Sequence, residues 1–282
     1  MYKERKIKSS ELLQLLLLNG IYSQSGSEQI IFQGGTALKW IYGGMRFSED
    51  LDFVTSLSKE RIEKILAQTF KKAKNPCIAQ FGPGQFETKR NKGRLDAVKT
   101  FFIYRPDHQR ERIAVKVEFE KLREGYAPAF KNLVLRDLPS VSAMITSGDL
   151  IMPYSSSIVL SETPEEIFSD KIRAIFEKKY IKGRDIYDIW WLSQQFNIRT
   201  DWSMVRKKFS MYKTKFIPAR ESDFFQKRKN MQDIINALKA DLPRFIPENI
   251  YALYNENGFD PFIKSLNTLT SNLLKQGMEK VF

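Results

Sequence analysis

The chain has 282 residues, about twice the length of a typical domain, and 42% of them are hydrophobic, so it can bury a substantial core. Its 46 basic residues exceed its 33 acidic ones, and the resulting net charge of +13 favours a polyanionic partner. The single cysteine, Cys77, excludes a disulfide framework and a cysteine-based metal site. The single histidine, His108, excludes a histidine-rich metal site, and the absence of a long apolar run excludes a membrane-spanning helix.

The first half of the chain is predicted to alternate helices and strands. Apolar residues at helical spacing predict helices over residues 10–18, 36–42 and 59–74. Short apolar or alternating runs predict strands over residues 29–32, 51–55, 97–104 and 112–120. From Thr163 onward the pattern becomes mainly helical. We therefore expect an α+β domain over residues 1–155 with a mixed sheet flanked by helices, then a mainly α-helical domain over residues 156–282, the boundary lying within Pro153–Pro164.

The densest motif joins a predicted strand to a helix through paired glycines, Gly34 and Gly35, followed by Thr36. Glycines allow a ligand to approach the backbone closely, and a helix N-terminus presents unpaired N–H groups at its positive end. This combination suits a phosphate group.

Asp50 and Asp52 follow on the next predicted strand, where residues two apart project from the same face, roughly 6.6 Å apart at Cα. At about 4 Å their carboxylates would repel by about 4 kcal/mol at an effective dielectric of about 20. A divalent cation between them, such as Mg²⁺ with its preference for oxygen ligands, would relieve that repulsion. The alternative is a strand-end turn with two solvated aspartates.

The strand predicted at residues 112–120 places Ile113, Val115, Val117 and Phe119 on one face and Lys116, Glu118 and Glu120 on the other. If this strand lies beside the Asp50–Asp52 strand, Glu118 can complete a three-carboxylate cation site. Lys116 could then offset the negative charge or contact a phosphate. An edge strand with a polar outer face explains the same pattern.

A lysine, Lys171, lies in the middle of an apolar helix face, four residues from both Ile167 and Ile175. It requires an anionic partner there, because burying an unpaired charge is costly. Arg184 and Asp188 are spaced for a helical ion pair, and Asp185 could cap that helix or face Lys171. A structural ion-pair network between two helices is the alternative to a catalytic role.

The segment from Arg206 to Lys229 holds nine basic and two acidic residues, hence a local charge of +7, with aromatic residues interleaved. Such a segment suits nucleic-acid phosphates, although a solvated helix face explains it equally well. The candidate nucleic-acid-binding residues are Arg206, Lys207, Lys208, Lys213, Lys215, Lys227, Arg228 and Lys229.

Four ordered motifs together resemble a known family: Gly-Gly-Thr-Ala-Leu from Gly34, Arg-Phe-Ser-x-Asp-Leu-Asp-Phe from Arg46, Lys-Val-Glu from Lys116, and Asp-Lys-Ile-Arg-Ala from Asp170 with Arg-Asp-Ile-Tyr-Asp-Ile from Arg184. The chain resembles, in these motifs and in their order, the AbiEii/AbiGii-type toxins of bacterial abortive-infection and toxin–antitoxin systems. Members of that family are nucleotidyltransferase-like proteins with the minimal fold of DNA polymerase β. The resemblance spans about residues 30 to 192.

The resemblance implies that Gly34, Gly35 and Thr36 hold the triphosphate of an NTP, and that Asp50 and Asp52 bind Mg²⁺ or Mn²⁺ with Glu118 as third acid. Ser48 and Lys116 join the expected nucleotide-binding residues, and a serine at the position of Ser48 is phosphorylated by the antitoxin in some relatives. Lys171, with Asp185 or Asp188, matches a lysine and an aspartate needed for activity. One departure is Gln33, where many relatives carry a lysine.

The expected function is therefore transfer of a nucleoside monophosphate from an NTP to an acceptor hydroxyl, by a toxin acting in the cytoplasm with no membrane partner. The net charge favours a structured RNA as acceptor, with the tRNA 3′ end foremost, and a cognate antitoxin is a possible partner. Two alternatives stay open: an NTP- or RNA-binding module with weakened catalysis, which Gln33 favours, and a transferase acting on a small molecule or protein hydroxyl.

Overall fold

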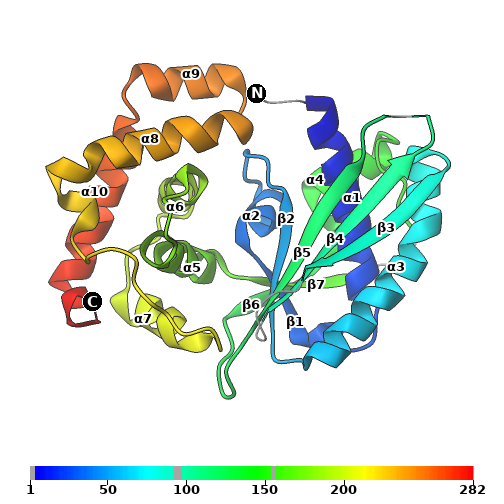
Figure 1. Cartoon of the computed structure of the whole chain (residues 1–282), viewed down its shortest axis with the longest axis horizontal. Coiled ribbons are helices and arrows are strands. Elements are labelled where there is room, and N and C mark those ends of the chain that lie inside the picture. Colours follow the sequence, from blue (N-terminus) through cyan, green and yellow to red (C-terminus); the bar gives the residue numbers. More distant parts are fainter. Residues whose placement is uncertain (1–3, 92–96, 109, 154–156, 282) are drawn as a thin grey trace. The chain divides into compact units, whose positions relative to one another are not determined.

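The computed structural model describes residues 4–91, 97–108, 110–153 and 157–281 of the chain (Figure 1). Its contacts divide the chain into two units. Among the described residues, the sheet unit contains residues 4–44 together with Ser48–Thr163, and the helical unit contains Met45–Phe47 and the residues from Pro164 onward.

In the described part of the sheet unit, seven strands form one mixed sheet in the order β3-β4-β5-β2-β1-β7-β6. The pairs β2–β5 and β1–β7 are parallel, and the other neighbouring strands are antiparallel. The strands are β1 (Ile30–Gln33), β2 (Asp50–Thr55), β3 (Gly84–Asn91), β4 (Ala97–Pro106), β5 (Ile113–Lys121), β6 (Phe130–Val134) and β7 (Ile158–Glu162).

The sheet unit also contains helices, most of which pack directly on the sheet. They are α1 (Glu4–Tyr22), α2 (Gly34–Tyr42), α3 (Lys59–Phe81) and α4 (Pro139–Thr146). Helix α1 packs against α3 and β5, whereas α2 packs against β1, β2 and β7. Phe53 lies at the centre of the core, with ring centroids 5.3 Å from Phe32 and 5.0 Å from Phe119. Because successive strand residues point to opposite faces, burying Phe53 sends Asp50 and Asp52 to the other face.

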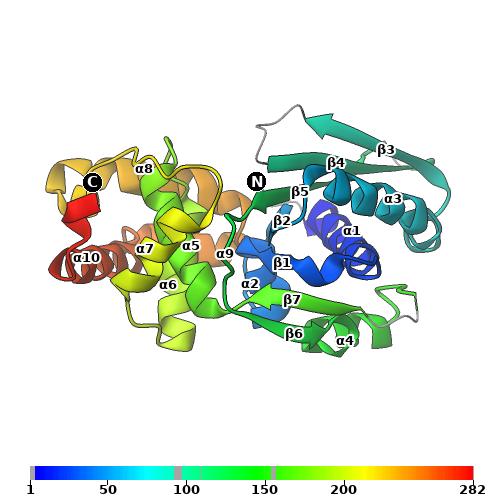
Figure 2. The same ribbon diagram turned by 90° about the horizontal axis from the view of Figure 1, so that it is seen from below.

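The helical unit is built around α5, which packs against α6 and α7, while α6 also packs against α8 and α10 (Figure 2). The helices are α5 (Pro164–Glu177), α6 (Gly183–Phe196), α7 (Trp202–Met211), α8 (Met231–Asp241), α9 (Glu248–Glu256) and α10 (Asp260–Lys275). The short segment Met45–Phe47 joins this unit because the Phe47 N–H donates a hydrogen bond of 2.8 Å to the Phe245 carbonyl.

The expected α+β class with a mixed sheet is confirmed. The bounds of two elements differ from those that the sequence predicts. Helix α3 continues through Pro76 to Phe81, since Ala73, Cys77 and Phe81 extend its buried face past the proline. Strand β7 lies after residue 155 but pairs with β1 and β6, so the chain changes unit after Thr163. The expected boundary stretch, Pro153–Pro164, includes residues 154–156, which lie outside the described residues. Within the described ranges, no helix combines the length and apolar character needed to cross a bilayer.

Candidate active site

The candidate site is built on the polar face of the parallel pair β2–β5. In this pair Asp50 lies opposite Lys116, and Asp52 lies opposite Glu118. Both aspartates are half-buried, whereas Leu51 between them is fully buried in the core. Two aspartates, one glutamate and one lysine therefore share one face at the centre of the sheet.

The glycine turn lies directly against Asp52. Gln33, the last residue of β1, is the antiparallel partner of Asp52, and α2 begins at the next residue. Gly34 has φ of +78°, and a Cβ on it would lie 2.9 Å from Asp52 Oδ2. The glycine thus permits both the left-handed backbone and the close approach. It brings the N-terminus of α2, with its unpaired N–H groups and positive dipole end, beside the Asp52 carboxylate.

Two further contacts hold the entry into β2 in place. The Thr36 hydroxyl donates to the Asp50 carbonyl, so Thr36 offers its backbone N–H rather than its side chain to a ligand. The Gln14 amide donates a 2.5 Å hydrogen bond to the Ser48 carbonyl, and its oxygen accepts from the Trp40 indole at 3.3 Å. Ser48 itself is buried. Helices α1 and α2 therefore both restrain the segment that leads to Asp50.

Lys116 lies between two of the acids. Its Nζ is 2.8 Å from Asp50 Oδ2 and 3.3 Å from Glu118 Oε2, while Lys99 Nζ is 2.5 Å from Glu118 Oε1. Burial alone would lower the pKa of Lys116, but the Asp50 ion pair and the charges of Asp52 and Glu118 outweigh it and raise that pKa. Burial likewise raises the pKa of Glu118, and Lys99 and Lys116 more than reverse this, so the net shift is downward.

Asp50 and Glu118 are each paired with lysines. Among the described residues, no group of three or more His, Cys, Asp or Glu side chains is arranged to hold a metal ion. The reason is visible in the contacts, because Lys99 and Lys116 each take one Glu118 oxygen. The donor set nevertheless fits a hard cation, since Asp50 and Asp52 present carboxylate oxygens from one face and an ammonium group already lies beside Asp50.

Lys171 belongs to a buried ion-pair network in the helical unit. Its Nζ lies 2.8 Å from Asp185 Oδ1 and 2.8 Å from Asp188 Oδ2, and Lys178 Nζ lies 2.7 Å from Asp185 Oδ2. The Arg46 guanidinium binds Asp188 in a bidentate manner, at 2.5 and 2.6 Å. Asp188 is thus bound by Arg46 and Lys171, which come from two different segments of the chain.

The charges of this network set its pKa values. Burial opposes ionisation of Asp185, but Lys171 and Lys178 hold its pKa well below the ordinary value. The pKa of Asp188 is lowered against burial by Arg46 and Lys171. Both carboxylates are thus charged partners of Lys171, and the contacts of Lys171 and Asp185 described here lie within the helical unit.

The basic segment is exposed at six of its eight candidate residues, namely Arg206, Lys207, Lys213, Lys215, Arg228 and Lys229. The prediction for Lys208 is wrong. Its side chain is fully buried and pairs with Glu166 at 2.9 Å and Asp170 at 2.6 Å, because it lies on the face of α7 that packs against α5. Lys227 is partly buried and pairs with Asp223 at 2.7 Å and with Glu221.

Sequence reasoning missed Arg46, Lys99 and Lys178. Arg46 is 142 residues from Asp188, so no local spacing could pair them. Lys99 lies in β4 directly opposite Glu118, and the pairing of β4 with β5 would have revealed it. Lys178 lies seven residues before Asp185 but beyond the end of α5, where helical spacing no longer applies.

The fold matches solved structures over nearly its whole length. The crystal structure of JHP933 from Helicobacter pylori matches with a TM-score of 0.55 and 17% identity, covering 99% of this chain and 97% of that one. A second H. pylori structure, described as a "putative nucleotidyltransferase", matches with a TM-score of 0.54 and 18% identity, covering 99% of each chain. The fold is thus nucleotidyltransferase-like, with the acidic strand pair and glycine turn in its sheet unit.

A sequence model of the family described as nucleotidyl transferase AbiEii toxin, type IV toxin–antitoxin system, matches residues 16–261. The chain therefore belongs to the AbiEii family of nucleotidyltransferase toxins, as its ordered motifs predict. No curated protein matches the sequence.

Proposed function

We propose that the protein transfers a nucleoside monophosphate from an NTP to a hydroxyl of a structured RNA, foremost the 3′ end of tRNA, in a Mg²⁺- or Mn²⁺-dependent reaction. The observation that carries this proposal is the register of β1, β2 and β5, which sets Asp52 beside both Glu118 and the glycine turn of α2. Blocked tRNA would stop translation, which accounts for toxicity in the cytoplasm and for the need of a cognate antitoxin.

The N-terminus of α2 is the proposed seat of the triphosphate. The first-turn N–H groups from Gly34, Gly35 and Thr36 have no partners within the helix, and the helix dipole favours negative charge there. Gly34 supports the assignment because it allows the backbone to lie against Asp52. Gln33 adds an uncharged amide where many relatives carry lysine, so we expect a weaker hold on the phosphates.

Asp50 and Asp52 would hold the divalent cation, with Glu118 as a third oxygen donor. When bound, the cation supplies charge neutralisation at the attacking and leaving oxygens of an in-line displacement. The chain's own contribution is to fix the two aspartates on one strand face. Lys116 would shift from Asp50 toward the phosphates, a movement that its contacts with two different acids allow.

The resemblance implies that Lys171 and Asp185 act in catalysis. Their buried ion pair also supports a positioning role, in which each fixes the side chain of the other. Within the helical unit Lys171 lies 2.8 Å from both Asp185 and Asp188, and Asp185 is also paired with Lys178 at 2.7 Å. The direct neutralisation of developing charge by Lys171 stays a prediction.

The acceptor is assigned to RNA on electrostatic grounds. The net charge of +13 and the six exposed basic residues between Arg206 and Lys229 support a phosphate-rich partner. Binding to such a partner must weaken steeply with salt, whereas a small-molecule or protein acceptor would show a shallow dependence.

The decisive experiment is incubation of the protein with each radiolabelled NTP, Mg²⁺ and total RNA, followed by gel electrophoresis. We expect labelled tRNA with the natural protein and none with Asp50→Asn combined with Asp52→Asn. The matched control is Asp149→Asn, which removes an exposed aspartate paired with Lys8 in the same unit. Undiminished labelling by the double variant would overturn the assignment of the site.

One observation favours a second candidate, a binding module with weakened catalysis. Gln33 lies at the N-cap of α2 and makes no side-chain capping hydrogen bond there. Equilibrium NTP binding without transfer to any RNA would support this candidate. NTP binding with transfer would exclude it.

A further inference from the structure

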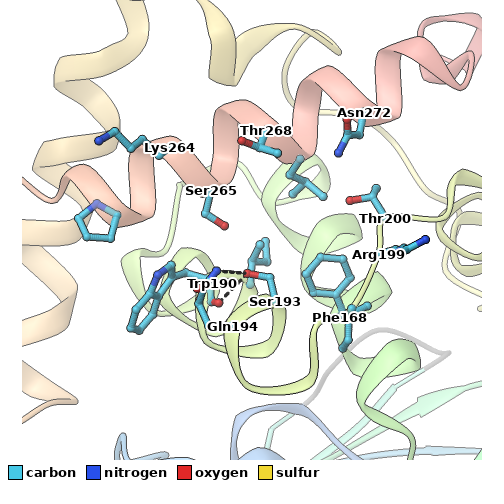
Figure 3. A pocket seen from close by; sticks show the side chains of 14 residues that line it. Phe168, Trp190, Ser193, Gln194, Arg199, Thr200, Lys264, Ser265, Thr268 and Asn272 are labelled. Carbon is cyan, nitrogen blue, oxygen red and sulfur yellow. Dashed lines mark hydrogen bonds between the residues drawn. The ribbon is translucent and has the colours of Figure 1, made fainter.

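A pocket in the helical unit has no role in the transfer proposed above. This open pocket is lined by α5, α6 and α10 and by the segment 198–200 that follows α6 (Figure 3). Its volume is about 650 Å³, within the range of pockets that enclose small ligands. All of its lining residues belong to the helical unit, so that unit alone defines its shape.

The pocket offers a planar aromatic wall. Trp190 lines it from α6, and the Trp190 ring is held edge-to-face by Phe262 at 5.0 Å and by Tyr254 at 5.6 Å between centroids. Phe168 from α5 lines another side and is almost fully buried. A ring whose orientation is fixed in this way presents a preorganised surface to a flat ligand.

Polar side chains that both donate and accept hydrogen bonds complete the lining. Figure 3 shows Ser265, Thr268 and Asn272 on α10 across the pocket from Ser193 and Gln194 on α6. The amides of Gln194 and Asn272 each carry a carbonyl acceptor and an NH₂ donor, which is the complement of a nucleobase edge. Such a pairing of an aromatic ring with amides is typical of sites that bind unpaired bases.

The charge of the pocket is positive. Its 14 lining residues include Arg199 and Lys264 and no acidic residue. Arg199 is exposed, and Lys264 forms an exposed pair with Asp260 at 2.7 Å. An exposed pair of this kind contributes at most about 1 kcal/mol, so an incoming anion can compete for Lys264. The pocket thus combines a flat apolar wall, amides that can form hydrogen bonds with a nucleobase, and cations that can bind a phosphate.

We propose that this pocket binds a single nucleotide, with the base between Trp190 and the two amides and the phosphate at Arg199. The same chemistry is present in a free nucleoside monophosphate and in one unpaired nucleotide of an RNA strand. The proposal concerns binding in the helical unit and does not depend on transfer by the aspartate site.

The test measures binding to the full-length protein carrying Asp50→Asn and Asp52→Asn, in EDTA, so that nucleotide held by the sheet unit does not contribute. Calorimetric titrations use AMP, CMP, GMP and UMP in one arm and unpaired five-nucleotide RNAs in the other. The variant is Gln194→Leu, and its matched control is Gln195→Leu, the neighbouring exposed glutamine that does not line the pocket.

We expect saturable binding that weakens by about fivefold to tenfold in Gln194→Leu, the effect of about one lost hydrogen bond, and that is unchanged in Gln195→Leu. Binding of the monophosphates identifies a free nucleotide as ligand, whereas binding of the RNAs alone identifies an unpaired strand. Asn272→Leu provides the same test from α10 if Gln194→Leu lowers stability. No binding in either arm, or equal binding by Gln194→Leu and Gln195→Leu, overturns the proposal, and the radiolabel transfer assay stays independent of that result.

Discussion

The close approach of Gly34 to Asp52 permits a sharp test of the site. Replacing Gly34 by alanine places a methyl group 2.9 Å from Asp52 Oδ2, whereas ordinary contact begins at 3.4 Å, so the carboxylate must retreat by about 0.5 Å (3.4 − 2.9). The left-handed backbone at φ +78° adds about 1–2 kcal/mol of strain for an alanine. We therefore expect a stability loss of about 1–2 kcal/mol.

The catalytic consequence of Gly34→Ala should exceed the stability loss. A misplacement of about 1 Å at a reacting centre can cost about a hundredfold in rate, so a shift of half that size should lower transfer by at least about tenfold. The measurements are urea unfolding for stability and initial rates of radiolabelled nucleotide transfer to RNA.

The same helix supplies a matched control in Gly43, which has φ of +76° and open space around its Cβ position. Gly43→Ala should show a similar loss of stability because the backbone strain is the same, but it should retain its transfer rate. If Gly34→Ala and Gly43→Ala transfer nucleotide equally well, the triphosphate and cation do not lie at this turn, and our reasoning about the site is wrong.

Three further predictions concern the helical unit. Asp188→Asn leaves the Arg46 guanidinium buried without its carboxylate and should lower the free energy of unfolding by about 3 kcal/mol in urea titrations. Because the folded pKa values of Asp185 and Asp188 are lowered, their stabilisation is present above pH about 4 and is lost as the pH falls through the lowered values. Acid unfolding followed by circular dichroism should therefore show a weaker pH dependence in Asp188→Asn, and an identical profile would contradict the network. Arg206→Gln with Lys207→Gln should reduce the slope of log binding constant against log salt for tRNA by up to about 2, whereas Lys208→Met should leave the slope unchanged.

The sequence was sufficient to predict the central strands and the face on which their charges lie. The alternation around Leu51 and Phe53 and that from Ile113 to Phe119 are local signals, and each strand can be interpreted without its neighbours. That these two strands are adjacent and parallel, with Asp52 opposite Glu118, depends on long-range pairing that alternation does not encode.

Other features depend on contacts that no local pattern carries. Strand β7 has few residues and pairs with β1, more than a hundred residues earlier, so its membership of the sheet was missed. Lys208 resembles its basic neighbours in sequence, but the face of α7 on which it lies is decided by Glu166 and Asp170 on α5.

The segment Met45–Phe47, which belongs to the helical unit, matters for any attempt to express the two units separately. A fragment beginning at Pro164 omits Arg46 and so leaves Asp188 without its bidentate partner. It also lacks the Phe47 backbone hydrogen bond to Phe245 and the stacking of those two rings at 6.3 Å. Splitting the gene after Thr163 would therefore yield a C-terminal product with an incomplete interior, unless residues 45–47 were added to that fragment.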